Sequence, residues 1–251
     1  MIQLKSPREL ETMAAGGRIL ASTHQHIQPA IQPGATSMQL DAMVERFIRS
    51  HAGASPSFKG LYGFPGSACI SINEEIVHGI PSPKRVLKDG DIVTVDIGVH
   101  YGGFHTDSAW TYGVGTIAPE AKRLLEVTEA SLWAGIAQAK IGNHIGDIGA
   151  AVEGLVEKAR FSVVRDLVGH GVGAQMHEEP QVPNHGKPQR GPRLQVGMTI
   201  AIEPMVNAGG PATRTLADKW TIVTLDGELS AHFEHTVAIT ADGPKVLTTL
   251  G

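Results

Sequence analysis

Apolar residues recur at helical spacing in four stretches of the chain. The sequence Ser6-Pro7-Arg8-Glu9 combines a capping box with a proline at the first helical position, which predicts a helix from there to about residue 27. A second helix is expected from about residue 37 to residue 51. Pro119 opens a third, which continues to about residue 139, and a fourth is expected to end near residue 160.

Segments rich in Val, Ile and Thr follow each predicted pair of helices, as is typical of strands. The order helix, helix, strands therefore occurs twice. This order predicts an α+β fold in which the helices pack on one side of mostly antiparallel strands. The proline-rich stretch 180–193 is expected to form a loop on the strand side.

The chain also resembles itself at a spacing of about 100 residues. The segments 87–97 and 194–204 share the pattern Leu-x-x-Gly, then two β-branched positions, then an acid at Asp96 and Glu203. The segments 34–48 and 142–156 match in the same order. We therefore expect one catalytic domain, residues 1–251, made of two pseudo-symmetric halves of about 1–114 and 115–251.

Composition and charge exclude several classes of protein. Hydrophobic residues make up 41% of the chain and charged residues 18%, so it can bury a large core. A net charge of −4 without a basic stripe argues against nucleic-acid binding. The single cysteine, Cys69, excludes an intramolecular disulfide, and no apolar run suggests a membrane span or a secretory signal. A cytoplasmic location is expected.

Two aspartates are expected to meet in a β-hairpin. The segments 93–99 and 104–112 alternate like paired strands around the glycines of His100-Tyr-Gly-Gly103. If the turn is centred between Tyr101 and Gly102, Asp96 and Asp107 face each other with Cβ atoms about 5 Å apart, where like charges repel. A divalent cation between them would remove the repulsion. The alternative is a pair of exposed aspartates that flank a turn.

Three further ligands are predicted to join them. Glu203 ends one apolar strand, Glu234 lies within another at 233–239, and both are costly there unless paired or metal-bound. His170 is flanked by glycines, and its alternative role is that of a packed loop residue. Four carboxylates and one imidazole are too many for a single open zinc site and suit two divalent ions about 3.5–4 Å apart.

Taken together, these motifs resemble those of type I methionine aminopeptidases of the short bacterial form, members of peptidase family M24 with the duplicated pita-bread fold. The resemblance covers nearly the whole chain, and its motifs are specific only in combination. They are His78-Gly-Ile-Pro, Asp96-Ile-Gly, His105-Thr-Asp107, Gly169-His-Gly-Val-Gly, His177-Glu, Glu203-Pro and Glu234-His-Thr-Val. The length leaves no room for the large insertion of type II enzymes or for a zinc-binding N-terminal extension.

The resemblance implies a role for each motif residue. The implied metal ligands are Asp96, Asp107, His170, Glu203 and Glu234, with Asp107 and Glu234 bridging two ions. It implies that a hydroxide bridging the ions attacks the scissile carbonyl and that Glu203 moves a proton to the leaving amine. His177 would stabilise the developing oxyanion or hold the peptide, and His78 would hydrogen-bond the scissile amide region; the alternative for His78 is a turn residue before Gly79.

A pocket for methionine needs soft apolar walls. The family pattern places them at Phe58, Leu61, Phe64, Cys69 and Trp220. Phe58 stands where many bacterial members carry cysteine, and Leu61 and Phe64 where tyrosines are common, which affects pocket selectivity; plain core packing is the alternative for both phenylalanines. The family also places a monovalent cation near Asn73, Glu75 and Ser230.

The expected function is removal of the N-terminal methionine from nascent proteins and peptides whose second residue is small. The expected cofactors are two divalent ions, Co²⁺, Mn²⁺, Fe²⁺ or Zn²⁺, and the expected partners are nascent N-termini, encountered at the ribosome by a monomeric enzyme. Two alternatives remain at this stage, an Xaa-Pro peptidase of the same fold and a non-catalytic peptide-binding module. Xaa-Pro peptidases usually carry an additional N-terminal domain, and a binding module would be expected to have lost metal ligands.

Overall fold

The computed structural model describes residues 2–250 and contains the four predicted helices. The ends predicted for them lie within two residues of those observed. The predicted capping box forms at the first helix, where Ser6 N donates to Glu9 Oε2 at 2.7 Å. Thr36 and Gln39 form a second one. The helices are α1 (Pro7–Ile27), α2 (Ser37–Arg49), α3 (Pro119–Gln138) and α4 (Ile145–Lys158), and two short 3₁₀ turns span Gln28–Ala30 and Leu61–Gly63.

The longest strands form the predicted hairpin, but its register differs from the prediction. Gly102 and Gly103 both have positive φ, as a type I′ turn requires, so the turn is centred between these two glycines. Asp96 therefore pairs with Ala109, and Asp107 pairs with Gly98. The two aspartates are diagonal neighbours on one face rather than direct partners. The strands of the hairpin are β4 (Ile92–Tyr101) and β5 (Phe104–Gly113).

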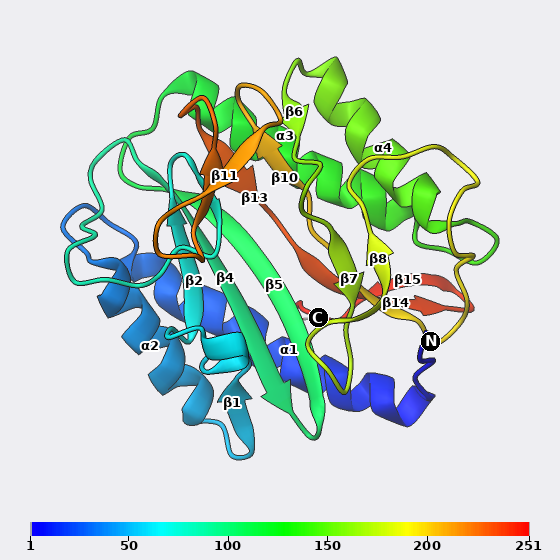
Figure 1. Ribbon diagram of the computed structural model, residues 1–251. Helices are drawn as coiled ribbons and strands as arrows, with labels where there is room; N and C mark the ends of the chain where they lie inside the picture. Colours follow the sequence, from blue (N-terminus) through cyan, green and yellow to red (C-terminus); the bar gives the residue numbers. More distant parts are fainter. Residues whose placement is uncertain (1, 251) are drawn as a thin grey trace.

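The first sheet is built on this hairpin. Strands β1 and β2 pair with β4, and all pairings are antiparallel. Helices α1 and α2 cover one face of the sheet, as Figure 1 shows in blue, and bury an apolar cluster between themselves and the strands. The added strands are β1 (Ala54–Pro56) and β2 (Ala68–Ile72).

The second large sheet has the order β15-β14-β9-β7-β8, so that β8 lies at its edge. Helices α3 and α4, green in Figure 1, bury the largest apolar cluster against this side of the molecule. The predicted α+β arrangement of helices packed against antiparallel strands is confirmed. The strands are β7 (Gly169–Gly171), β8 (Glu178–Val182), β9 (Thr199–Ile202), β14 (His235–Thr240) and β15 (Gly243–Val246).

Two three-stranded sheets complete the architecture, with the orders β13-β10-β6 and β11-β12-β3. Among residues 2–250, no helix is both long and apolar enough to cross a membrane. That the chain consists of two pseudo-symmetric halves stays a prediction. The remaining strands are β3 (Glu75–Val77), β6 (Ser162–Val163), β10 (Met205–Asn207), β11 (Thr213–Thr215), β12 (Ile222–Thr224) and β13 (Ser230–His232).

The proline-rich stretch 180–193 differs from its prediction in two ways. Its first three residues belong to strand β8, and the loop that follows packs against helix α4 instead of the strands. Gly149 and Gly146 of α4 make this possible, because a Cβ at either position would lie within 2.4 Å of a loop carbonyl oxygen. The helix acids Asp147 and Glu153 then accept hydrogen bonds from backbone amides of the loop.

Candidate metal centre and pocket

The hairpin of the first sheet and β14 of the second meet at the centre of the molecule. Thr236 of β14 joins them, since its hydroxyl accepts from Asp107 N at 2.8 Å and donates to Asp107 O at 2.9 Å. Glu234 N donates to Ala109 O at 2.8 Å, and Ser108 Oγ donates to Glu234 O. These contacts hold Asp107 and Glu234 on facing elements.

Glu234 does not lie inside a strand, which corrects the prediction. Strand β13 ends at His232 and β14 begins at His235, so Phe233 and Glu234 form the break between them. The break has a physical reason, because the amide of Glu234 pairs with β5. The chain crosses here from one sheet to the other and turns the carboxylate inward.

His170 of β7 is oriented as a metal ligand would be. Its Nδ1 donates to the carbonyl of Gly171 at 2.9 Å, which leaves Nε2 without a proton in the neutral ring. Nε2 lies 3.5 Å from Glu203 Oε1 and 3.8 Å from Asp107 Oδ2. Burial lowers the pKa of His170 to about 4, so the ring is neutral at pH 7.

All five predicted ligands come together, and the four acids are buried without adequate partners. One carboxylate oxygen of each has no hydrogen-bond partner among the described residues. One ligand atom each from Asp107, His170 and Glu234 lies within 4.8 Å of the other two. The partnerless oxygens belong to Asp96, Asp107, Glu203 and Glu234.

The pKa values of these four acids are raised, as expected for buried carboxylates that lack partners. Burial raises the pKa of Asp96 to about 7. The pKa of Asp107 is raised well above its usual value by burial and by the charges of Glu234 and Asp96. Burial and neighbouring carboxylates likewise raise the pKa of Glu203 and Glu234. A divalent cation would supply the missing partner for every oxygen, so the residues present fit a metal centre.

A cavity of 290 Å³ opens beside the acids and contains every predicted pocket residue. Phe64 meets Trp220 edge to face with centroids 5.2 Å apart, and Phe58 packs over Gly98, where a Cβ would collide with its ring. Burial raises the pKa of Cys69, so its thiol is neutral. The apolar side chains Phe58, Phe64, Cys69 and Met176 form one buried cluster, with Leu61 and Trp220 packed against it.

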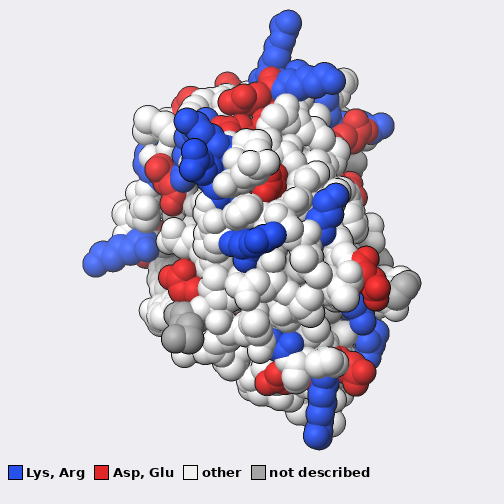
Figure 2. Space-filling model, turned by 90° about the vertical axis from the view of Figure 1, so that its right-hand side faces the viewer, with Lys and Arg blue, Asp and Glu red and all other residues white. Residues whose placement is uncertain are grey.

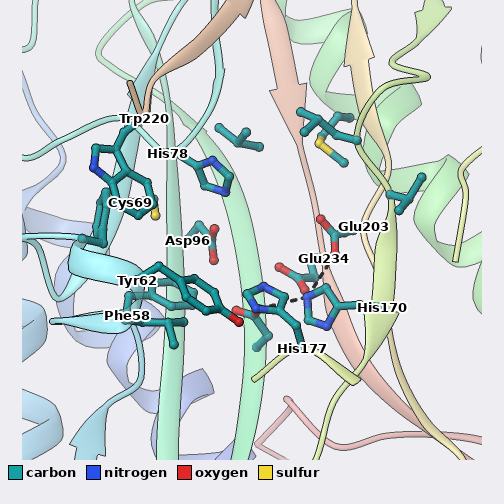
Figure 3. A pocket seen from close by; sticks show the side chains of 17 residues that line it. Phe58, Tyr62, Cys69, His78, Asp96, His170, His177, Glu203, Trp220 and Glu234 are labelled. Carbon is teal, nitrogen blue, oxygen red and sulfur yellow. Dashed lines mark ion pairs between the residues drawn. The ribbon is translucent and has the colours of Figure 1, made fainter. Parts of the chain in front are cut away.

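Two predicted histidines flank the acids. His78 has a positive φ of 59°, and its ring stands edge-on to Trp220. Burial lowers the pKa of both His78 and His177, so both rings are neutral near pH 7. His177 lies at the rim, with its ring centroid 4.5 Å from that of His170. Figure 3 shows the order, with Trp220 and Cys69 at one end, Asp96 and Glu234 between, and His170 at the other end.

The sequence did not single out three residues that the structure places here. His232 is 2% exposed, and its Nε2 lies 3.9 Å from Glu203 Oε2. Tyr62 is 75% exposed and stacks on His177 at the mouth of the cavity. Asn184 donates to the backbone oxygen of Glu203 at 2.9 Å. A histidine two positions before Glu234 was a usable signal for His232; nothing local marked Tyr62 or Asn184.

A buried ion pair supports the loop that carries His177. Lys5 Nζ donates to Glu178 Oε2, and the two side chains are 4% and 5% exposed. The other oxygen of Glu178 accepts from Gln175 N at 3.0 Å. Gly173 leaves room for the ammonium group, because a Cβ there would lie 2.5 Å from Nζ.

The residues predicted near a monovalent cation lie close together, and several of their polar atoms are already bound to protein groups. Ser230 N donates to Asn73 O at 3.0 Å. Glu75 accepts from Ile72 N with one oxygen and pairs with Arg85 through the other. A cation site there stays a prediction.

The sequence and the fold both have known relatives. The chain is 56% identical to methionine aminopeptidase 1 of Bacillus subtilis over 99% of both proteins, and 51% identical to a methionine aminopeptidase of Clostridium perfringens over the full length of both. A crystal structure of methionine aminopeptidase from Thermotoga maritima superposes with a TM-score of 0.97 at 42% identity, covering 99% of this chain and all of the other.

More distant structures share the fold alone. A prolidase from Pyrococcus horikoshii superposes with a TM-score of 0.80 at 22% identity, covering 99% of this chain and 64% of the prolidase. The predicted pita-bread fold is thereby confirmed. A sequence model of metallopeptidase family M24 matches residues 11–241. The chain therefore belongs to metallopeptidase family M24 and, within it, to the methionine aminopeptidases.

Proposed function

We propose that the protein hydrolyses the peptide bond after an N-terminal methionine when the second residue is small. One observation carries the proposal. Four buried carboxylates that lack partners stand directly beside a largely apolar cavity of 290 Å³. The relatives that are 56% and 51% identical over the whole chain, both named methionine aminopeptidases, support the same reading.

We assign the metal ligands as Asp96, Asp107, His170, Glu203 and Glu234, with Asp107 and Glu234 shared between two ions. The shared role suits Asp107 and Glu234 because they face each other across the junction of the two sheets. The ions, when bound, polarise the scissile carbonyl and make water a stronger nucleophile at neutral pH. Co²⁺, Mn²⁺, Fe²⁺ and Zn²⁺ all accept this set of oxygen and imidazole ligands.

The protein's own side chains transfer the proton of the attacking water and stabilise the developing negative charge. Glu203 accepts a proton from the attacking water and passes it to the leaving amine, and Asn184 holds its backbone in place. His177 and His78 are neutral, so each has one N–H to donate. We assign His177 to the developing oxyanion and His78 to the scissile amide.

The apolar cluster selects methionine by shape and softness. An unbranched thioether fits beside aromatic edges such as those of Phe64 and Trp220. Outside this cluster, Leu167 and Met205 also line the cavity. A bulky second residue would displace the carbonyl from the acids, and an ångström of misplacement can lower a rate about 100-fold.

The proposed setting is the cytoplasm, where a monomeric enzyme meets the N-termini of nascent polypeptides at the ribosome. Nucleic-acid binding by the enzyme itself is not part of the proposal. Basic and acidic side chains are interspersed on the face shown in Figure 2, without a patch of one sign.

Turnover by metal-depleted protein, with single metals added back, tests the function. The expected result is cleavage of Met-Ala-Ser, little cleavage of Met-Ile-Ser, and none of Ala-Pro-Ser. Preferred cleavage of Ala-Pro-Ser would establish the Xaa-Pro alternative, and binding of Met-Ala-Ser without turnover in any metal would establish a peptide-binding module.

A further inference from the structure

Two hollows on the surface of the second sheet adjoin the active-site cavity, one directly and one by way of the first, through shared lining residues. The first hollow shares Val168, His170 and His177 with the cavity and is also lined by Gln3, Gln175, Glu179 and Gln181. The second shares Glu179 and Gln181 with the first and reaches Lys187 and Arg190 in the loop on α4. Shared walls thus connect the acids to the loop 183–192.

The order of groups along this path gives it a direction. The apolar cluster lies at one end of the cavity and His170 at the other, with the carboxylates between them (Figure 3). A methionine side chain in the cluster therefore directs the rest of the substrate past His170 and His177. The first hollow begins at these two residues.

The chemistry of the first hollow suits a peptide backbone. Gln3, Gln175 and Gln181 are exposed, and each amide side chain both donates and accepts hydrogen bonds, so together they serve any sequence. Strand β8, which contributes Glu179 and Gln181, is the edge strand of its sheet. An extended peptide can hydrogen-bond to the carbonyl oxygens and remaining amides of such an edge independently of its side chains, although Pro180 in the middle of β8 has no N–H to donate.

The second hollow adds a preference for charge. Lys187 and Arg190 are exposed on its wall. Asp147 and Glu153, the nearest acids of α4, hold the loop backbone and are not among its lining residues. Glu179, between the two hollows, has the opposite sign, so the preference changes along the path.

We propose that these hollows form one groove that binds the substrate polypeptide beyond its second residue, through the glutamines first and the basic loop further out. The inference rests on the proposed function, because the substrate must be a chain anchored by its N-terminus. The occupant is a nascent or unfolded polypeptide segment, favoured when acidic residues reach Lys187 and Arg190.

A peptide series tests the groove through ratios of kcat/KM. The substrates are Met-Ala-Ser and nonapeptides that begin with Met-Ala-Ser and continue in Gly and Ser, with a pair of Glu or Lys at positions 4–5, 6–7 or 8–9. The nonapeptides should exceed the tripeptide by about tenfold. Glu pairs should exceed Lys pairs by about threefold to tenfold at one outer position, less so in high salt.

Three variants locate the effect. Gln175→Ala/Gln181→Ala should reduce the length advantage for every nonapeptide, and Lys187→Glu/Arg190→Glu should reverse the preference between Glu and Lys pairs. Lys122→Glu on α3, an equally exposed reversal outside the groove, should change neither ratio. Because each ratio is taken within one preparation, the fraction of folded or metal-loaded enzyme cancels.

The outcomes separate the groove from the reaction. No cleavage of Met-Ala-Ser in any metal contradicts the proposed function. Cleavage of Met-Ala-Ser with equal rates for all nonapeptides overturns the groove, as does a length and charge preference that all three variants retain.

Discussion

Charged side chains are buried in two places that differ in one respect. Lys5 and Glu178 are almost fully buried, yet each faces an opposite charge, and Glu178 also accepts a backbone amide. The central acids are also largely buried, Glu203 less so than the others, and one oxygen of each lacks a partner within the described chain. At Lys5 and Glu178, the protein itself supplies a partner for each buried charge.

The difference identifies which buried charge is structural and which awaits a ligand. Taking a charge out of water costs several kcal/mol unless another charge or hydrogen bonds replace the water. At Lys5 and Glu178 the fold supplies that replacement. At Asp107 and Glu234 it supplies only backbone anchoring, so the metal-free protein neutralises these acids by binding protons, and a bound cation would replace those protons.

The largest effect is expected from Asp107→Asn. If Asp107 is shared between two ions, as proposed, its loss should abolish binding of one of them and lower turnover of Met-Ala-Ser by about 10³-fold or more. Titration with Mn²⁺ followed by metal analysis, together with kinetics, measures both.

Asp41→Asn is the matched control, because Asp41 is also buried but accepts hydrogen bonds from Ser67 N and Ala68 N. It should retain both ions. If Asp41→Asn loses metal as Asp107→Asn does, burial without partners is not what distinguishes the site.

A double-mutant cycle on the free energy of unfolding measures the interaction between Lys5 and Glu178. Lys5→Met or Glu178→Gln alone leaves a buried charge unpaired and should lower the free energy of unfolding by about 3–5 kcal/mol. Lys5→Met/Glu178→Gln removes both charges and should lose much less. Denaturant unfolding of the three variants measures this, and single changes that simply add in the double variant would show that the two charges do not interact.

A smaller loss of activity is expected at His177, which lies beside both the ion pair of Glu178 and the central acids. His177→Ala removes a substrate contact outside the ligand set, so kcat should fall by about 10²–10³-fold while KM and metal content change little. Kinetics alongside metal analysis checks this. Metal loss in this variant would place His177 among the ligands.

The smallest effect concerns pH. The pKa of Asp96 is raised to about 7 and those of Asp107, Glu203 and Glu234 are raised well above their usual values, so the metal-free fold binds more protons than the unfolded chain. Its stability therefore falls as pH rises from about 4 towards these raised pKa values. Buried His24 and His235, with pKa values lowered to about 4, act oppositely, but only between about pH 4 and 6.5.

Above pH 6.5 the carboxylates act alone. The melting temperature of metal-free protein should fall by about 2–4 °C between pH 6.5 and 8.5, and Mn²⁺ should remove the fall. Calorimetry with and without chelator measures it. If the melting temperature changed with pH in the same way with and without chelator, the fold itself would already compensate the charges of the acids.

The sequence predicted the helices well, for local reasons. Capping boxes and a 3.6-residue apolar period are determined within a few neighbouring residues, as at Ser6 and Glu9. The five residues predicted as metal ligands all line one cavity, and their role as ligands stays a prediction. The acids among them could be singled out because a carboxylate in an apolar stretch is costly unless it is paired.

Features that depend on distant parts of the chain were predicted less well. The hairpin register depended on which glycines adopt positive φ, and the choice of Gly102 and Gly103 moved Asp96 away from direct pairing with Asp107. The break at Glu234 exists because β5 captures its amide. The path of the proline-rich loop was set by Gly146 and Gly149, two glycines in a helix on which sequence periodicity gives no information.

The contacts of Lys5 also determine when the site can form during synthesis. The backbone of Lys5 donates to Gly197 O, its side chain reaches Glu178, and Gly17 of the first helix packs against the carbonyl of Leu247. Each contact joins the beginning of the chain to parts translated more than 170 residues later. A ribosome-bound chain that stops before residue 234 lacks one of the acids and the strand beside it. An enzyme that would act on unfinished proteins is thus inactive while it is itself unfinished.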